Sequence, residues 1–221
     1  MTDALGLVTV RDPLSPVSEA YRTLRMNLQF AALDTALHTI LITSPGPGEG
    51  KSAAVANLAV TMAQAEQHVV AIDCDLRRPR LHQLFGLENT TGLTTMMVEE
   101  NALDAPPLQD TSVQGLKLLA SGPLPPRPAD LLGSQRMERV IKRLLEDAQI
   151  LLFDAPPVMA VTDAIVLATK VDGVLLVVSA GDTKREHAQG AIERLTKANA
   201  NILGAVLTNV PVDAAVRSYY R

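Results

Sequence analysis

The segment best suited to chemistry is the nine-residue stretch SPGPGEGKS at 44–52. It follows a short apolar run and precedes residues with helical spacing, which is the context that a phosphate-binding loop requires. Glycines let such a loop curl until its backbone N–H groups face an anion, with the positive end of a helix dipole behind them. We expect Lys51 to reach the β- and γ-phosphates of a nucleotide and the Ser52 hydroxyl to coordinate Mg²⁺. The residues predicted to contact the nucleotide are Gly46, Pro47, Gly48, Glu49, Gly50, Lys51, Ser52 and Ala53.

Pro45 departs from the usual pattern of this loop, which has a glycine six residues before the lysine. A glycine-rich turn that ends in a surface lysine is the simpler structural alternative. The coincidence of strand, glycines, Lys-Ser pair and helix favours a nucleotide site over that alternative.

Two further apolar runs end in carboxylates. VVAID at 69–73 is followed by Cys74 and Asp75, and ILLFD at 150–154 ends in Asp154. Ligands of open α/β sheets collect at the carboxyl ends of strands, and alternation along an extended chain directs Asp73 and Asp75 to similar sides. Such carboxylates can hold Mg²⁺ or accept a hydroxyl proton. For Asp154 alone, a helix N-cap or a solvated strand end is the structural alternative, but its place after four apolar residues favours a metal site.

The elements that position these residues alternate between strand and helix patterns. Strand-like runs lie at 39–43, 69–73, 115–120, 150–154, 173–178 and 202–209, and helical stretches at 51–66, 134–148, 161–170 and 184–198. This alternation predicts an α/β fold, doubly wound, with a mainly parallel sheet covered by helices on both faces. We expect one P-loop domain over 1–211 with a helix at about 15–36 after a loose leader, and a flexible tail at 212–221.

Composition excludes several functional classes. The 221 residues suffice for one sizeable core, and a net charge of −4 gives no reason to expect nucleic acid as a partner. A single cysteine allows no intramolecular disulfide, which favours a reducing compartment and a cytoplasmic location. No apolar run approaches the roughly 20 residues that span a bilayer, so membrane association is expected only through a partner.

Three motifs together resemble those of the bacterial tyrosine kinases of capsule and exopolysaccharide biosynthesis: SPGPGEGKS, VVAIDCDLR and ILLFDAPP. The likeness covers nearly the whole chain, and the family tolerates a non-glycine residue at the position of Pro45. The D-x-D-x-R pattern of Asp73, Asp75 and Arg77 is the most specific of the three. The resemblance implies a protein tyrosine kinase that uses ATP and Mg²⁺.

The resemblance also implies roles for single residues. Lys51 polarises the phosphates, and Ser52 holds Mg²⁺ together with Asp73 and Asp154, directly or through water. Asp75 is the candidate base for the tyrosine hydroxyl, and Arg77 belongs to the same catalytic motif. Asn209, which ends LTN at 207–209, matches the position that reads adenine in the wider family, with a turn residue after a strand as its alternative.

Self-association and phosphorylation sites follow from two further matches. Glu19, Arg22 and Arg25 fit the family's E-x-x-R-x-x-R pattern, which implies a ring-shaped homo-oligomer, commonly an octamer. Spacing alone places these three on one helical face, where an intrahelical row of ion pairs is the alternative. Tyr219 and Tyr220 are the expected phosphorylation sites, because a mobile terminus can enter a neighbour's active site. Adjacent tyrosines without such a role are the alternative.

Partners are implied by the resemblance alone. They are a transmembrane adaptor of the polysaccharide co-polymerase class, which recruits the kinase to the inner face of the membrane, and other tyrosine-containing protein substrates. The nearest rival is an ATPase switch of the ParA/MinD type, whose signature lysine five residues before Lys51 is replaced here by Gly46. A nitrogenase-like iron protein lacks support because it needs ligand cysteines. A nucleotide-binding scaffold of a polysaccharide-assembly complex stays open.

Overall fold

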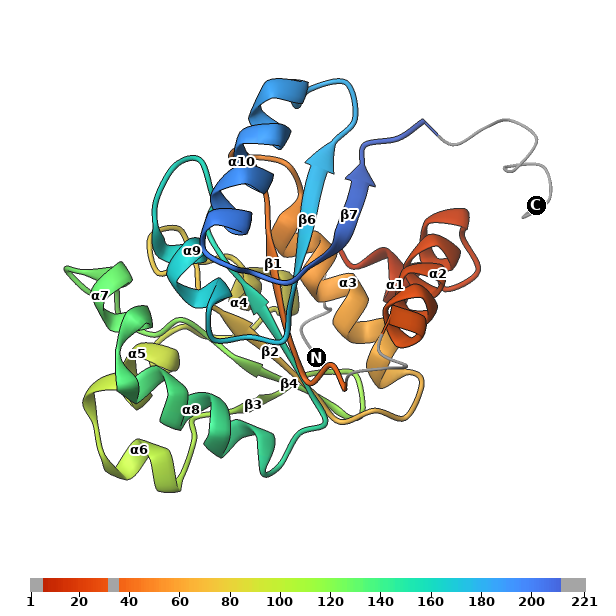
Figure 1. Cartoon of the computed structure of the whole chain (residues 1–221). Coiled ribbons are helices and arrows are strands. Elements are labelled where there is room, and N and C mark those ends of the chain that lie inside the picture. Colours follow the sequence, from red (N-terminus) through yellow and green to blue (C-terminus); the bar gives the residue numbers. More distant parts are fainter. Residues whose placement is uncertain (1–5, 32–35, 212–221) are drawn as a thin grey trace.

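The computed structural model describes residues 6–31 and 36–211. Within these ranges seven strands form one sheet in the order β3-β4-β2-β5-β1-β6-β7 (Figure 1). Every pairing is parallel except that of β3 with β4. The strands are β1 Thr39–Thr43, β2 Val69–Asp73, β3 Gln109–Asp110, β4 Leu116–Leu119, β5 Ile150–Asp154, β6 Gly173–Ser179 and β7 Ile202–Thr208.

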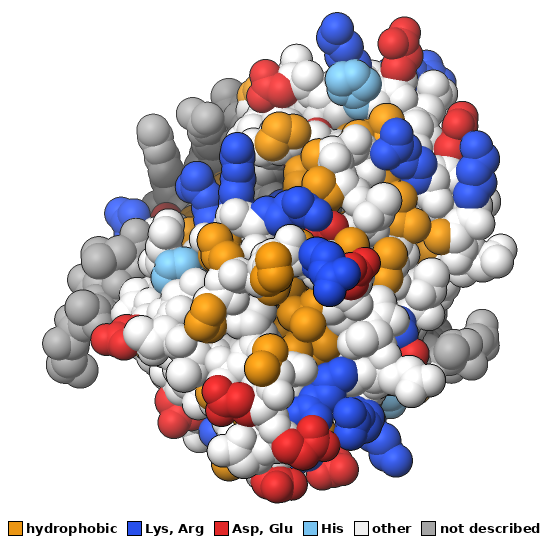
Figure 2. All heavy atoms as spheres, turned by 90° about the vertical axis from the view of Figure 1, so that its left-hand side faces the viewer, with side chains coloured by type: hydrophobic (Ala, Val, Ile, Leu, Met, Phe, Trp, Pro, Cys, Tyr) orange, Lys and Arg blue, Asp and Glu red, His pale blue; other side chains and the backbone are white. Residues whose placement is uncertain are grey.

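Helices cover both faces of this sheet (Figure 1). One layer consists of α1 Val8–Arg11, α2 Pro16–Ala31, α3 Lys51–Ala63 and α4 Leu81–Phe85. The other consists of α5 Leu93–Val98, α6 Asn101–Asp104, α7 Pro128–Gly133, α8 Gln135–Leu145, α9 Asp163–Ala168 and α10 Arg185–Lys197. Figure 2 shows that the side of the molecule carrying α7 and α8 exposes a group of hydrophobic side chains among lysines and arginines.

Each central strand contributes side chains to both faces, since successive residues of a strand point in opposite directions. On β1, Ile40 and Ile42 pack in the core under α3, whereas Leu41 packs in the core on the other face. On β5, Leu152 and Phe153 divide in the same way. Strands buried on both faces are continuous apolar runs in the sequence, which is why their positions could be predicted.

The neighbours of β5 decide where the functional residues meet. This strand lies between β1 and β2, and its register places Asp154 opposite both Ile42 of β1 and Asp73 of β2. Parallel strands in register end at the same edge of the sheet. The loops that follow β1, β2 and β5 therefore leave the sheet side by side.

The predicted fold class is confirmed, and the six predicted strands are present, but two features of local structure differ from expectation. The leader at 1–15 is not loose where the structure describes it, because Leu7 and Thr9 are buried and α1 forms. The opening helix is described from Pro16 to Ala31, and its predicted extension to about residue 36 falls on 32–35, which lie outside the described residues. The two-residue β3 was not predicted, because so short a run carries no periodicity.

No helix in the described parts of the chain is long and apolar enough to cross a membrane.

We predict that Asn57→Ala weakens the docking of α1 on α3. The Asn57 amide oxygen accepts hydrogen bonds from the Thr9 N–H at 3.2 Å and the Thr9 hydroxyl at 2.8 Å, and both residues are buried. Leaving these donors unsatisfied should lower the free energy of unfolding by about 1–3 kcal/mol, measured by urea denaturation. The exposed Asn27→Ala on α2 is the matched control, with an expected change within about 0.5 kcal/mol. Equal midpoints for the two variants would contradict this account of the amino-terminal segment.

Candidate functional site

The loop between β1 and α3 has the backbone shape that binds phosphate. Gly48 and Gly50 have φ angles of 79° and 84°, a left-handed conformation that glycine adopts without strain. Gly50 caps the amino end of α3, which begins at Lys51 and runs for 13 residues. The first amides of this helix therefore face the loop with the positive end of the helix dipole.

The side chain of Glu49 braces this loop from inside. It is buried, and one carboxylate oxygen accepts a hydrogen bond from the Gly46 N–H at 2.7 Å. The other oxygen accepts from the Ser179 N–H at the end of β6, at 3.3 Å. The Glu49 backbone carbonyl accepts from the Thr208 hydroxyl at the end of β7, at 2.8 Å. Glu49 thus ties the loop to two neighbouring strand ends.

Lys51 is the cation at the centre of the site. Its Nζ lies 2.8 Å from Asp75 Oδ2 and 3.5 Å from Asp154 Oδ1, and the three side chains are almost completely buried. Burial lowers the pKa of Lys51, but Asp154 and Asp75 outweigh that effect and raise it above its ordinary value. The ammonium therefore stays charged, yet one positive charge faces Asp73, Asp75 and Asp154.

Asp73 stabilises the segment that follows β2. Its Oδ2 accepts hydrogen bonds from the backbone N–H groups of Arg80 and Leu81, both at 2.9 Å. Its Oδ1 accepts from the Asp75 N–H at 3.2 Å. Burial, together with repulsion from Asp154, raises the pKa of Asp73 to about 7. Near neutral pH this carboxyl is only partly ionised.

Asp154 is the site residue whose carboxylate oxygens lack hydrogen bonds in the described structure. It is fully buried, and neither carboxylate oxygen makes a hydrogen bond to any described residue. Burial raises its pKa, and Lys51 opposes that rise. Buried polar atoms without partners are rare in folded proteins and indicate a missing water, ion or ligand.

An open cavity of about 390 Å³ lies over Lys51 and Asp75. It is lined by the loop residues Pro47, Gly48, Glu49, Gly50, Lys51, Ser52 and Ala53. Asp75, Arg78, Arg80, Leu84 and Pro157 complete the lining. Sequence reasoning did not select the last four, although Arg78 and Arg80 stand directly after the D-x-D-x-R motif.

Five residues expected at the site do not line this cavity: Gly46, Asp73, Arg77, Asp154 and Asn209. Asp154 lies behind the lining, 3.5 Å from Lys51, and Asp73 accepts the Asp75 N–H. The Gly46 N–H points to Glu49 rather than to the cavity. The Asn209 side chain donates a hydrogen bond to the Ser179 hydroxyl at 2.9 Å, and its backbone has a φ of 56°, typical of a turn. Arg77 does not line the cavity, since its guanidinium makes two hydrogen bonds to Asp163, at 2.9 and 3.0 Å.

The pair of Arg77 and Asp163 links two of the loops at the site. Asp163 is fully buried at the start of α9, beyond the loop that follows β5, whereas Arg77 belongs to the segment that follows β2. A buried carboxylate held by a two-point guanidinium contact fixes the orientation of both partners. The pair therefore holds the Asp75 segment against the segment that follows Asp154.

The residues present fit a nucleotide and Mg²⁺. The loop amides and Lys51 suit phosphate, and Ser52, Asp73 and Asp154 offer only oxygen atoms, which Mg²⁺ prefers. Within the described residues no cluster of three or more His, Cys, Asp or Glu side chains forms a cage for a metal. Mg²⁺ commonly completes its coordination with water and substrate phosphate and therefore does not require a cage made of protein ligands alone.

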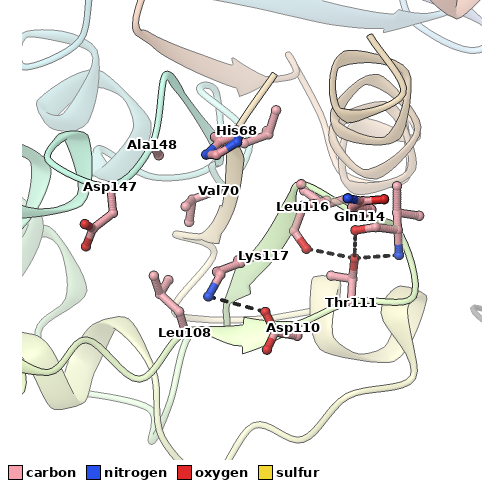
Figure 3. A pocket seen from close by; sticks show the side chains of 13 residues that line it. His68, Val70, Leu108, Asp110, Thr111, Gln114, Leu116, Lys117, Asp147 and Ala148 are labelled. Carbon is pink, nitrogen blue, oxygen red and sulfur yellow. Dashed lines mark hydrogen bonds and ion pairs between the residues drawn. The ribbon is translucent and has the colours of Figure 1, made fainter. Parts of the chain in front are cut away.

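A second cavity, of about 630 Å³, lies at the opposite end of the sheet. Val69 and Val70 at the start of β2 and Leu116 and Lys117 at the start of β4 contribute to its lining, and Lys117 pairs with Asp110 at 3.3 Å (Figure 3). No residue expected to act on a nucleotide lines it.

The expected oligomerisation residues lie on α2. Arg22 forms an ion pair with Glu19 within the helix, as the intrahelical alternative requires for these two residues. Arg25 is not part of that pair, and its Nε atom is buried without a hydrogen-bond partner among the described residues. Tyr219 and Tyr220 lie outside the described residues.

We predict that Asp73 makes the ligand-free protein less stable as the pH rises. In the unfolded chain Asp73 loses its proton near pH 4, whereas in the folded protein it keeps the proton until about pH 7. The folded state therefore binds more protons between these values, and the free energy of unfolding falls with rising pH, by up to about 1.4 kcal/mol per pH unit for one such group.

Asp73→Asn mimics the protonated carboxyl and should reduce this slope in urea denaturation at pH 5, 6 and 7 with a chelator present. Asp110→Asn, at a carboxylate whose side chain is 85% exposed, is the matched control and should leave the slope unchanged. An undiminished slope in Asp73→Asn would refute the assignment.

Comparison with known proteins agrees with this geometry. Residues 35–213 match the ParA family, described as NUBPL iron-transfer P-loop NTPase. The iron transfer in that description is a property of the described family, and the single cysteine of this chain, Cys74, is buried. At 21% identity and a TM-score of 0.65, the septum site-determining protein MinD of Pyrococcus horikoshii shares the fold alone.

Much closer relatives are tyrosine kinases. The tyrosine-protein kinase YwqD of Bacillus subtilis is 41% identical over 91% of this chain and 85% of its own length. The kinase domain of the Escherichia coli tyrosine kinase ETK superposes with a TM-score of 0.89 at 32% identity, over 97% of this chain and 84% of that one. The chimerical protein CapA2B2 superposes with a TM-score of 0.87 at 33% identity, over 96% and 92%. This chain therefore belongs to the nucleotide-binding P-loop NTPases of the ParA type and, among them, to the bacterial tyrosine-protein kinases.

Proposed function

We propose that this chain transfers the γ-phosphoryl group of Mg-ATP to protein tyrosines, including Tyr219 and Tyr220 of a neighbouring copy. The observation that carries the proposal is the meeting of Lys51 with Asp75 and Asp154, at 2.8 and 3.5 Å, beside a phosphate-binding loop. Such a site brings a cation for phosphates, a carboxylate for a metal and a carboxylate for a proton within contact of one another. The tyrosine-kinase names of the relatives support the tyrosine acceptor.

The ligands of the metal follow from the hydrogen bonds already present. In the proposal Ser52 and Asp154 hold Mg²⁺ directly, because both oxygens of Asp154 lack hydrogen bonds within the described structure. Asp73 acts through water, because its oxygens already accept three backbone hydrogen bonds. When bound, Mg²⁺ neutralises charge on the transferred phosphoryl group.

Asp75 is proposed as the base, and Lys51 controls its availability. Without nucleotide, Asp75 Oδ2 accepts a hydrogen bond from Lys51 at 2.8 Å, so this oxygen is occupied. Phosphates of a bound nucleotide compete for the Lys51 ammonium and leave Oδ2 free to accept the phenolic proton. The other oxygen keeps its hydrogen bond from the Arg78 N–H at 3.0 Å, which fixes the orientation of the carboxylate.

The remaining site residues have supporting roles in the proposal. Arg77 positions the Asp75 segment through Asp163 and does not touch the reacting atoms. Asn209 contacts adenine after its amide leaves the Ser179 hydroxyl. Tyr21 packs against the core, and burial raises its pKa, so the two tyrosines at 219 and 220 are the better acceptors within this chain.

The assembly is proposed from the motifs. Glu19, Arg22 and Arg25 contribute to contacts between copies in a ring, supported by the Arg25 Nε atom that lacks a hydrogen-bond partner among the described residues. The likeness of the motifs to the capsule and exopolysaccharide kinases supports recruitment to the inner face of the membrane by a transmembrane adaptor. There the kinase regulates the polymerisation and export of a polysaccharide.

We predict that Asp75→Asn lowers the rate of tyrosine phosphorylation by about 10²- to 10⁴-fold, as expected for loss of a general base. Purified protein is incubated with Mg-ATP, and phosphotyrosine, released phosphate and ADP affinity are measured. ADP affinity should be retained or become tighter, because Asp75 is not proposed as a metal ligand and its loss frees the Lys51 ammonium for phosphate. Lys51→Met should weaken nucleotide binding as well, and Asp110→Asn should behave as the parent protein does.

Each contrary result points to a different function. Phosphate release without phosphotyrosine in the parent protein would indicate an ATPase switch. Nucleotide binding with neither activity would indicate a scaffold. Full tyrosine phosphorylation by Asp75→Asn would remove this residue from the mechanism.

A further inference from the structure

Two arginines at the cavity are not needed to explain nucleotide binding. Arg78 and Arg80 line it together with Asp75 and the phosphate-binding loop. Both residues are exposed, and neither forms an ion pair with any described carboxylate. A charged group that lines a cavity without a partner is available to recognise a ligand of opposite charge.

The carboxylates of the active site hold the backbone of these arginines. The Arg78 N–H donates to Asp75 Oδ1 at 3.0 Å, and the Arg80 N–H donates to Asp73 Oδ2 at 2.9 Å. The two guanidinium groups therefore project from a backbone that is fixed relative to the proposed base. An anionic group bound by these two arginines would therefore have a defined position relative to the acceptor hydroxyl at Asp75.

The same cavity contains apolar surface. Leu84 of α4 is half-buried and Pro157 in the loop after β5 is buried, and both belong to the lining. Apolar walls suit the ring of a tyrosine, whose hydroxyl must reach Asp75. Asp75, Leu84 and Pro157 thus provide the elements of an acceptor subsite, with Arg78 and Arg80 beside it.

We propose that this subsite selects tyrosines that carry an anionic group on the neighbouring residue, held by Arg78 and Arg80. The inference rests on the proposed kinase function and adds the class of acceptor. In the transfer, the phenolic oxygen forms a bond to the γ-phosphorus of ATP. The bond from that phosphorus to the bridging oxygen breaks, ADP leaves, and the phenolic proton passes to Asp75.

The proposed subsite leads to an expectation for the chain's own tyrosine pair, Tyr219 and Tyr220. RSYYR at 217–221 places arginines on both sides of the tyrosine pair and offers no anionic side chain next to either tyrosine. Phosphorylation of one tyrosine adds about −1.5 to −2 charge and so creates the neighbour that the subsite binds. The second phosphorylation of the pair is then faster than the first.

Three synthetic peptides test the proposal, each with one acceptor tyrosine preceded by Phe, Glu or phosphotyrosine in an otherwise identical sequence. For the full chain with Mg-ATP, we expect kcat/KM to be at least about tenfold higher for the Glu and phosphotyrosine peptides than for the Phe peptide. In Arg78→Gln/Arg80→Gln the ratio of kcat/KM for the Glu peptide to that for the Phe peptide should fall to about one, whatever the double variant does to the rate on the Phe peptide. The exposed Arg185→Gln on α10 is the matched control and should keep the preference.

Two results overturn the proposal. One is equal kcat/KM for the three peptides in the parent protein. The other is a higher KM for ATP in the double variant with the peptide preference intact, which would assign the arginines to the nucleotide. Peptide affinity for the protein loaded with Mg-ADP is measured in parallel. Tighter binding of the Glu peptide through Arg78 and Arg80 without any phosphotyrosine would retain the subsite and reject the kinase function.

Discussion

Parallel pairing of β5 with both β1 and β2 is the constraint on which the site depends. The pairing places Asp154 opposite Asp73 and beside the strand that leads into the phosphate-binding loop. Asp75 joins them two residues later, so three buried carboxylates surround the single ammonium of Lys51. Close carboxylates repel one another when ionised, and the raised pKa values of Asp73 and Asp154 reflect their burial and this repulsion. A divalent cation supplies the positive charge that Lys51 alone does not, and a nucleotide brings both the cation and a new partner for Lys51.

Contacts outside the cavity hold this charged centre together. Backbone amides bonded to Asp73 fix the segment that carries Asp75, and the Arg77–Asp163 pair fastens the same segment to the amino end of α9. Glu49 connects the phosphate-binding loop to the ends of β6 and β7. β7 is the last strand before the tail that contains the two proposed phosphorylation sites. The catalytic groups are therefore held by three separate sets of contacts. Each set reaches a segment outside the phosphate-binding loop.

The sequence predicted the elements whose signals are local and left out those that depend on contacts between distant residues. Strands buried on both faces are continuous apolar runs, so β1, β2 and β5 could be located, together with the carboxylates that end β2 and β5. The partner of Arg77 could not, because Asp163 is 86 residues away and nothing in the spacing connects them. Glu49 lines the cavity, and the bonds from its carboxylate to the loop itself and to the end of β6 could not be predicted from spacing. Arg78 and Arg80 are conspicuous in the sequence, yet only the folded structure shows that they line the cavity.

The dependence of ADP affinity on Mg²⁺ tests the central claim most directly, measured by calorimetry for the parent protein and for Asp154→Asn. In the parent protein, Mg²⁺ should strengthen ADP binding at least about tenfold, equivalent to about 1.4 kcal/mol. In Asp154→Asn this gain should vanish, while ADP binding without Mg²⁺ stays equal or becomes tighter because one negative charge has been removed. An undiminished gain from Mg²⁺ in Asp154→Asn would show that the three strand ends do not form one metal-nucleotide site.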